Sequence, residues 1–148
     1  MASSFVSQFL SFVPGLRLVD GGDLLALTNS IGSYTNGITA GVTATLALAT
    51  QLTATFNSVD TSTNSGTDGV ILPPALPGME IEIDNNTANT IYVWGVGANQ
   101  NNGGAADLII ASGSYGNGNA AAHVALASTK ASSYQCFTAG IWKQMISG

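Results

Sequence analysis

Apolar and polar residues alternate strictly from Met79 to Asp84, where Met and Ile take turns with Glu and Asp. A period of two residues is the pattern of a β-strand with one buried and one exposed face. The next residues are rich in Asn and Thr, which favour a turn because their side chains bond to the nearby main chain. A second apolar pattern follows at Thr90–Trp94. The sequence therefore predicts an antiparallel hairpin made of these two strands.

The chain after residue 36 keeps this β character. In residues 39–56 Thr alternates with Ala, Leu and Val, which favours strands although it also permits helix. Four later strands are predicted between turns rich in Gly and Asn: Asp107–Ala111, Ala121–Ser128, Ser133–Phe137 and Ile141–Ile146. Short strands separated in this way are typical of all-β domains. We expect residues 37–148 to form an antiparallel β-sandwich or a small jelly-roll-like barrel.

The first 36 residues have a different pattern. Phe5, Phe9 and Phe12 recur at intervals that suit one face of a short helix, and Pro14 with Gly15 ends the pattern. A brief strand at Leu16–Val19 and one or two helical turns at Asp23–Leu27 are expected to follow. Residues 1–36 are thus predicted to be an N-terminal arm and linker. The arm's apolar side chains either pack on their own domain or dock on another molecule.

The segment from Asp68 to Trp94 also carries a motif. Its pieces are Asp68-Gly69-Val70, Leu72-Pro73, Pro77-Gly78, Ile81–Asn86 and Ile91–Trp94, and Tyr134–Phe137 with Gly140–Trp142 continue it near the C-terminus. This order resembles a repeat-like β-module of structural proteins of tailed bacteriophages, which occurs in head decoration (cement) proteins and fibre proteins. The chain departs from that family at residues 97–106, where the family usually has a short Gly-Asp-x-Ile-Asn loop. The resemblance implies a virion protein and, for a decoration protein, a homotrimer.

Composition narrows the function classes. Charged residues make up 7% of the chain and the net charge is -5, whereas soluble domains usually have roughly 25% charged residues. The only cations are Arg17, Lys130 and Lys143, so nucleic-acid binding is disfavoured. A surface of hydroxyl and amide groups suits large assemblies, because such groups cost less to desolvate than charges. An ordinary low-charge β-domain would have the same composition.

Neither a membrane span nor a conventional signal peptide is expected. No apolar run approaches the roughly 20 residues of a membrane helix, and no basic residue precedes the apolar stretch at the N-terminus. Cys136 is the single cysteine, so no intrachain disulfide is possible. These features fit synthesis in the cytoplasm of a bacterial host and assembly into a virion.

No pattern predicts catalysis or a cofactor. His123, the only histidine, has no acid or nucleophile near it in sequence, so a structural role is expected rather than a metal site or a catalytic triad. Cys136 lacks basic neighbours that would lower its pKa, which favours a buried, inert thiol. The Asn-rich segment 98–104 has no Lys and does not suit a phosphate-binding loop.

The acidic face of the first predicted strand allows more than one interpretation. Glu80, Glu82 and Asp84 project from one face at about 7 Å spacing, close enough to share a cation. However, Ca²⁺ takes six to eight oxygens that usually converge from loops. These carboxylates also point in parallel instead of flanking a sugar, which argues against a glycosidase. A solvated face, or one that meets a cation of another subunit, fits better, so we expect no metal.

Four aromatic residues allow two interpretations. Tyr92, Trp94, Tyr115 and Trp142 could form a stacking platform for sugars, or they could pack in the core and at interfaces. Tyr92 and Trp94 lie on the same face of their strand. Exposure of both would favour the platform, and burial of both would exclude it.

The sequence thus predicts a non-enzymatic virion protein. We expect a capsid decoration (cement) protein that binds the major capsid protein on the outer surface of a phage head, stabilises contacts between capsomers and self-associates as a homotrimer. The trimer follows from the resemblance alone. Candidate capsid or subunit contacts are Phe5, Phe9, Phe12 and Arg17. The alternative is a head-fibre or tail-fibre module that binds a host receptor or glycan, while a secreted adhesin-like domain would require export.

Overall fold

The computed structural model describes residues 16–18, 24–26, 33–42, 45–113 and 120–146. The chain divides into two compact units, residues 1–32 and 33–148. In the first unit β1 (Leu16–Leu18) pairs antiparallel with β2 (Leu24–Ala26). The strand predicted near Leu16 is therefore confirmed, whereas the helical turns predicted from Asp23 are wrong. Pairing with β1 draws Leu24–Ala26 into an extended ribbon, and such a contact overrides a weak local helix preference.

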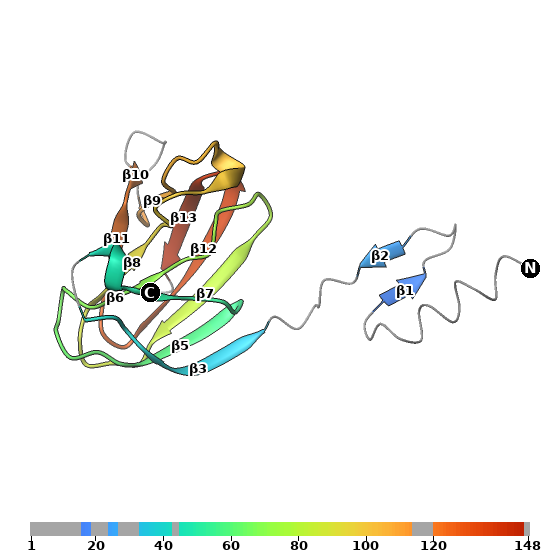
Figure 1. The fold of residues 1–148 in the computed structure, drawn as a ribbon. Coiled ribbons are helices and arrows are strands. Elements are labelled where there is room, and N and C mark those ends of the chain that lie inside the picture. The colour runs from blue at the N-terminus through green and yellow to red at the C-terminus, as the bar shows by residue number, and fades with distance from the viewer. Residues whose placement is uncertain (1–15, 19–23, 27–32, 43–44, 114–119, 147–148) are drawn as a thin grey trace, which may run out of the picture. The chain divides into compact units, whose positions relative to one another are not determined.

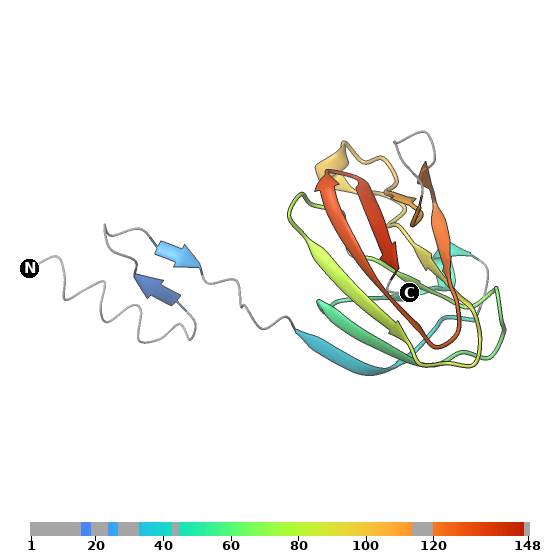
Figure 2. The same ribbon diagram turned by 180° about the vertical axis from the view of Figure 1, so that it is seen from behind.

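The second unit is the β-domain, and the described residues of its larger sheet form seven strands in the order β10-β9-β13-β12-β7-β5-β3. These strands are β3 (Tyr34–Thr39), β5 (Phe56–Thr61), β7 (Glu80–Asn85), β9 (Leu108–Ile110), β10 (Ala120–Ala121), β12 (Lys130–Thr138) and β13 (Ile141–Ile146). The neighbours β3, β5 and β7 run parallel, whereas β12 is antiparallel to both β7 and β13. Figure 1 and Figure 2 show this sheet from its two sides.

The smaller sheet, as far as the structure describes it, has four strands in the order β11-β8-β6-β4. They are β4 (Thr50–Gln51), β6 (Gly69–Ile71), β8 (Ile91–Trp94) and β11 (His123–Leu126). Again the three earlier strands run parallel, and the last one, β11, is antiparallel to β8. The described connections contain two short 3-10 helices, η1 (Leu46–Leu48) and η2 (Gln100–Asn102).

The order of the strands explains why so many pairs are parallel. From β3 to β8 the chain alternates between the two sheets, so that each odd-numbered strand lies in the larger sheet and each even-numbered one in the smaller. The chain thus makes three successive arches, β3 with β4, β5 with β6, and β7 with β8. Because each arch repeats the direction of the one before, neighbouring strands within a sheet run parallel. The prediction of an all-β domain is confirmed, but the expected purely antiparallel pairing is wrong.

One hydrophobic cluster fills the β-domain and takes side chains from both sheets. From the larger sheet it includes Ile81, Ile83, Tyr134 and Trp142, and from the smaller Val70, Ile91, Val93 and Leu126. The alternation predicted from the sequence is confirmed in β7, where Ile81 and Ile83 are buried and the acidic residues that alternate with them are exposed. Burying this apolar surface is the main driving force for folding.

The predicted hairpin between Met79–Asp84 and Thr90–Trp94 is wrong. Both strands exist, but β7 pairs with β5 and β12, while β8 pairs with β6 and β11 in the other sheet. The two strands bury apolar side chains in the same core from opposite layers, so the connection between them is an arch and not a tight turn. Asn85 closes this arch with a fully buried side chain. Its Nδ2 donates to the carbonyl oxygens of Asn89, Leu126 and Ala127 at 2.9 to 3.1 Å.

Candidate interaction surfaces

The sequence-predicted contact residues lie in the N-terminal unit. Phe5, Phe9 and Phe12 fall outside the described residues, and so does Tyr115. Arg17 is the middle residue of β1, opposite Leu25 of β2, and only its backbone is described. The role of Phe5, Phe9, Phe12 and Arg17 in binding therefore stays a prediction. The candidate surfaces described next lie on the β-domain, whose side chains are described.

A continuous row of side chains crosses the outer face of the larger sheet. Tyr34 of β3 is in register with Phe56 of β5, and Phe56 is in register with Glu82 of β7. Glu82 is opposite Ser133 of β12, which in turn is opposite Met145 of β13. We call these five residues the outer row. Its three apolar members are well exposed, Tyr34 at 65%, Phe56 at 41% and Met145 at 47%.

A groove of about 200 Å³ lies at the β3 end of the outer row. We call it the aromatic-acidic groove, and it is lined by Tyr34, Phe56, Asn57, Ser58, Glu82, Asp84 and Asn86. Two aromatic rings come from neighbouring strands, and two exposed carboxylates come from β7. None of the described lining residues is cationic, so the groove combines ring faces with two negatively charged side chains.

Asp60 braces the rim of this groove. Its carboxylate accepts hydrogen bonds from the backbone N–H of Gly37, from the Ser58 hydroxyl and from the Asn86 amide. These bonds hold the pKa of Asp60 below its usual value, with the bond from Gly37 contributing most. Gly37 has a φ of 70° at an irregularity in the pairing of β3 with β5, a conformation that Gly adopts without steric cost. Asp60 thus ties β3 to β5 and orients Asn86.

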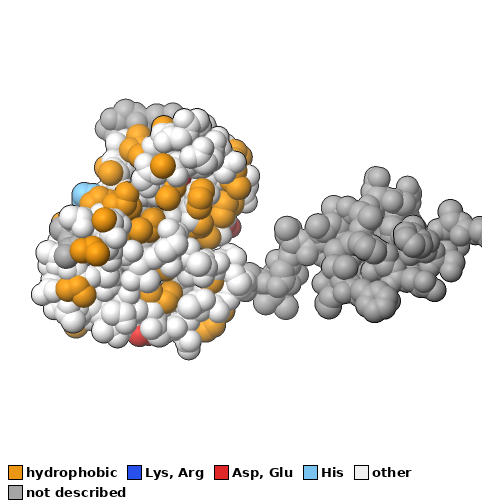
Figure 3. Space-filling view, in the orientation of Figure 1, with side chains coloured by type: hydrophobic (Ala, Val, Ile, Leu, Met, Phe, Trp, Pro, Cys, Tyr) orange, Lys and Arg blue, Asp and Glu red, His pale blue; other side chains and the backbone are white. Residues whose placement is uncertain are grey.

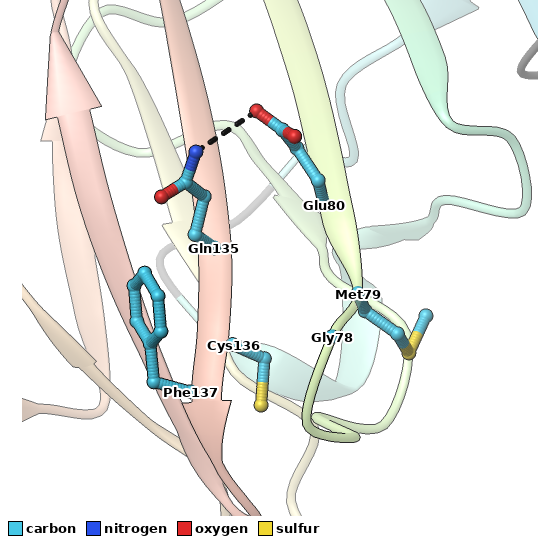
Figure 4. A pocket seen from close by; sticks show the side chains of 6 residues that line it. All are labelled: Gly78, Met79, Glu80, Gln135, Cys136 and Phe137. Carbon is cyan, nitrogen blue, oxygen red and sulfur yellow. Dashed lines mark hydrogen bonds between the residues drawn. The ribbon is translucent and has the colours of Figure 1, made fainter.

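A second hollow, of about 350 Å³, lies where β7 begins beside β12. Figure 4 shows its lining, in which Phe137 and Gln135 of β12 lie across from Glu80 of β7, with Gly78, Met79 and Cys136 completing it. Phe137 is 71% exposed. Glu80 accepts hydrogen bonds from Gln135 and Ser133, which lower its pKa, with the bond from Gln135 contributing most. This hollow therefore offers an apolar ring beside a carboxylate that is already hydrogen-bonded within the protein.

The thiol of Cys136 does not make this hollow reactive. Cys136 is buried, and its thiol donates to the carbonyl oxygen of Thr138 at 3.1 Å. Burial raises the pKa of Cys136, so the nucleophilic thiolate is disfavoured. The prediction of a buried thiol is confirmed.

A cluster of three rings lies on the outer face of the smaller sheet. His123 of β11 is opposite Trp94 of β8, with ring centroids 4.2 Å apart, and its ring centroid is 4.5 Å from that of Tyr92. All three residues are half-buried. Tyr92 and Trp94 are therefore neither exposed, which would favour a sugar-binding platform, nor buried, which would exclude it. Trp142 is wholly buried in the core, because it points inward from β13, and its proposed part in a platform is wrong. The His123 ring packs against both aromatic rings on this face, and its predicted structural role stays a prediction.

Several buried polar residues were missed from the sequence, and they shape the loops. Asp68, just before β6, is fully buried, and its Oδ2 accepts hydrogen bonds from the backbone N–H groups of Thr63 and Asn64 and from the Ser62 hydroxyl. Although burial alone would raise the pKa of Asp68, these bonds lower it. The Asp-Gly-Val motif contained the only signal for this site.

A similar network anchors the loop of residues 97–106. The Asp107 carboxylate accepts from the backbone N–H of Ala75 at 2.7 Å and from the Asn99 amide at 2.9 Å, and both residues are buried. The amide of Asn99 also donates to the carbonyl oxygen of Ala75. The base of this loop is therefore fixed to the segment before β7 that contains Ala75.

Comparisons with known proteins give no relative. No family model, no curated protein and no solved structure matches the chain. Within the described ranges, no helix has the length and apolar character needed to cross a bilayer. Nor do three or more His, Cys, Asp or Glu side chains in those ranges gather into a group that could hold a metal ion.

Proposed function

We propose that this protein is a capsid decoration protein that binds the outer surface of a phage head and stabilises contacts between neighbouring capsomers. In this proposal the partner is the major capsid protein, and the protein acts as a homo-oligomer, with three copies implied by the sequence resemblance. The N-terminal unit would contact the major capsid protein through Phe5, Phe9, Phe12 and Arg17. The β-domain would provide a rigid body with an additional contact face.

The observation that carries the proposal is the outer face of the larger sheet. Tyr34, Phe56, Phe137 and Met145 expose 41 to 71% of their surface there, although large apolar side chains usually avoid water. Aromatic residues and Met are enriched at protein interfaces, whereas charged residues are depleted at interface cores. The face drawn in Figure 3 likewise has apolar side chains scattered among uncharged groups, with few charged atoms visible. A low-charge surface with exposed rings supports a role in assembly.

The proposal is tested by binding to heads. Purified protein is mixed with heads of its phage that lack it, and bound protein is measured after sedimentation. We expect saturable binding at copy numbers that scale with the number of capsomers. We also expect that deletion of residues 1–15 leaves a folded β-domain, checked by circular dichroism, that no longer coats the heads. Unchanged head binding by this truncation would refute the role of the arm.

A fibre module that binds a host glycan is the second candidate, because of the partly exposed rings Tyr92, Trp94 and His123. Copy number in purified virions separates the two candidates. A decoration protein is present in hundreds of copies, whereas a tail fibre is present in a handful. Detection of only a few copies per particle would favour the fibre.

A further inference from the structure

We infer that the aromatic-acidic groove is a binding site for a single arginine side chain of a protein partner. The inference names the chemistry of a contact on the β-domain. Only the identity of the partner rests on the proposed function, because arginine binding by the groove can be tested without phage heads.

The arrangement of the lining residues matches a guanidinium group. Phe56 and Glu82 are register partners on adjacent strands, so their side chains start about 5 Å apart on one face. A planar cation can therefore stack on the Phe56 ring while its N–H groups reach the Glu82 carboxylate. Tyr34, the register partner of Phe56 on its other side, offers a second ring. Rings attract cations through the negative charge of their faces, and arginine is the cation most often found there.

The second carboxylate adds charge complementarity. Asp84 follows Glu82 by two residues on the same exposed face of β7, about 7 Å further along the strand. The described lining has two carboxylates and no cation, and the whole chain has a net charge of -5. Arginine is preferred over lysine because its guanidinium forms paired bonds with a carboxylate and stacks on rings, whereas the ammonium of lysine is a compact and strongly hydrated charge.

The size and rigidity of the groove point to one side chain and not to a larger ligand. Its volume of about 200 Å³ is below the ~300–1,000 Å³ of typical small-molecule sites. The brace from Asp60 to Gly37, Ser58 and Asn86 fixes the rim before any ligand arrives. A groove that is already formed loses little conformational freedom on binding.

The test is an NMR titration of the ¹⁵N-labelled full chain with the peptide acetyl-Gly-Arg-Gly-amide. The matched control peptide carries citrulline, which has nearly the shape of arginine without its charge, and a lysine peptide is measured in parallel. We expect weak but saturable shifts of amide signals in β3, β5 and β7 with the arginine peptide, smaller shifts with lysine and none with citrulline. Added salt should weaken the binding.

Variants assign the binding to the groove. The double variant Glu82→Gln with Asp84→Asn is expected to weaken binding about tenfold, because each surface carboxylate contributes modestly. Phe56→Leu keeps an apolar side chain but removes the ring face, and about a threefold loss is expected. Glu80→Gln is the control, since Glu80 lies on the same face of β7 but outside the groove and accepts from Ser133 and Gln135. Circular dichroism verifies that each variant is folded.

Three outcomes would overturn the inference. The first is equal shifts with the arginine and citrulline peptides. The second is binding of an oligosaccharide such as chitotriose at the same amides without binding of the arginine peptide. The third is a shift of these amides that depends only on protein concentration, which would assign the groove to a second copy of the chain. Failure of head binding with successful arginine binding would reject the proposed function and leave the site intact.

Discussion

Replacing Asn85 by Asp should reveal how much the arch between β7 and β8 depends on one side-chain amide. The Asn85 Nδ2 donates to three carbonyl oxygens at 2.9 to 3.1 Å, and its Oδ1 accepts from the Thr87 hydroxyl at 2.8 Å. The substitution keeps the shape of the side chain but replaces the donating Nδ2 group with an oxygen, which faces the three carbonyl oxygens. When the new carboxyl is protonated, it can serve only some of them. Leaving a buried carbonyl unsatisfied costs about 1–3 kcal/mol.

The effect of this substitution should grow with pH. A carboxylate facing carbonyl dipoles in a buried site is disfavoured, so the folded-state pKa of the new Asp is raised above its unfolded value of about 3.9. Stability relative to the wild type is therefore highest below pH 4 and falls as pH rises, by about 1.4 kcal/mol per pH unit until the folded-state pKa is reached. A rise of about two units in that pKa brings the total loss at pH 7 to about 4–6 kcal/mol.

The assay is urea unfolding followed by tryptophan fluorescence at pH 4, 5 and 7, with the wild type measured at each pH. Asn101→Asp, the same change at an exposed position in η2, is the control and should shift stability by less than about 0.5 kcal/mol. A variant that folds at pH 5 but not at pH 7 would agree with the reasoning. A loss for Asn85→Asp that equals that of the control, or that does not change with pH, would refute it.

Three further predictions concern other buried groups. Wild-type stability should fall as pH drops below about 4, because the lowered pKa of Asp68 stabilises the folded state only above that pH; Asp68→Asn should flatten this dependence in acid unfolding curves. Tyr134→Phe removes the hydroxyl that accepts from Gln144 at 3.2 Å and should cost about 1 kcal/mol in the same urea assay, and an unchanged midpoint would contradict it. The Cys136 thiol should react with a disulfide reagent at pH 8 more slowly than in urea, because it is buried and its pKa is raised, and equal rates would show that it is accessible.

Local sequence patterns predicted where the strands lie better than they predicted which strands pair with one another. The bounds of β13 agree with the predicted Ile141–Ile146, and β7 has the predicted buried and exposed faces. Both are short-range properties, since alternation depends only on which face is buried. The sheet to which a strand belongs depends on contacts with distant residues. The side chain of Asn85, which closes the arch between β7 and β8, finds two of its partners at the distant residues Leu126 and Ala127.

The candidate groove could not have been predicted for the same reason. Tyr34, Phe56 and Glu82 lie far apart in the sequence and meet only through the parallel register of β3, β5 and β7. Tyr34 itself belonged to a segment that was interpreted as linker. The acidic face of β7 was recognised from the sequence, including its fit to a cation of another chain. The sequence did not indicate that the rings of Tyr34 and Phe56 lie beside this acidic face.

The three arches give the β-domain two unlike ends. Among the strands that the structure describes, β3 and β4 at one end each have a single neighbouring strand, and at the other end β7 and β8 are covered by the antiparallel strands β12 and β11. A stack in which each unit contacts mainly its neighbours behaves as a one-dimensional array. Backbone amides of β3 and β4 should therefore exchange with solvent before those of β7 and β8. An additional arch inserted ahead of β3 would lengthen the array and leave the covered end unchanged, so a domain of this design can vary in length without a new core.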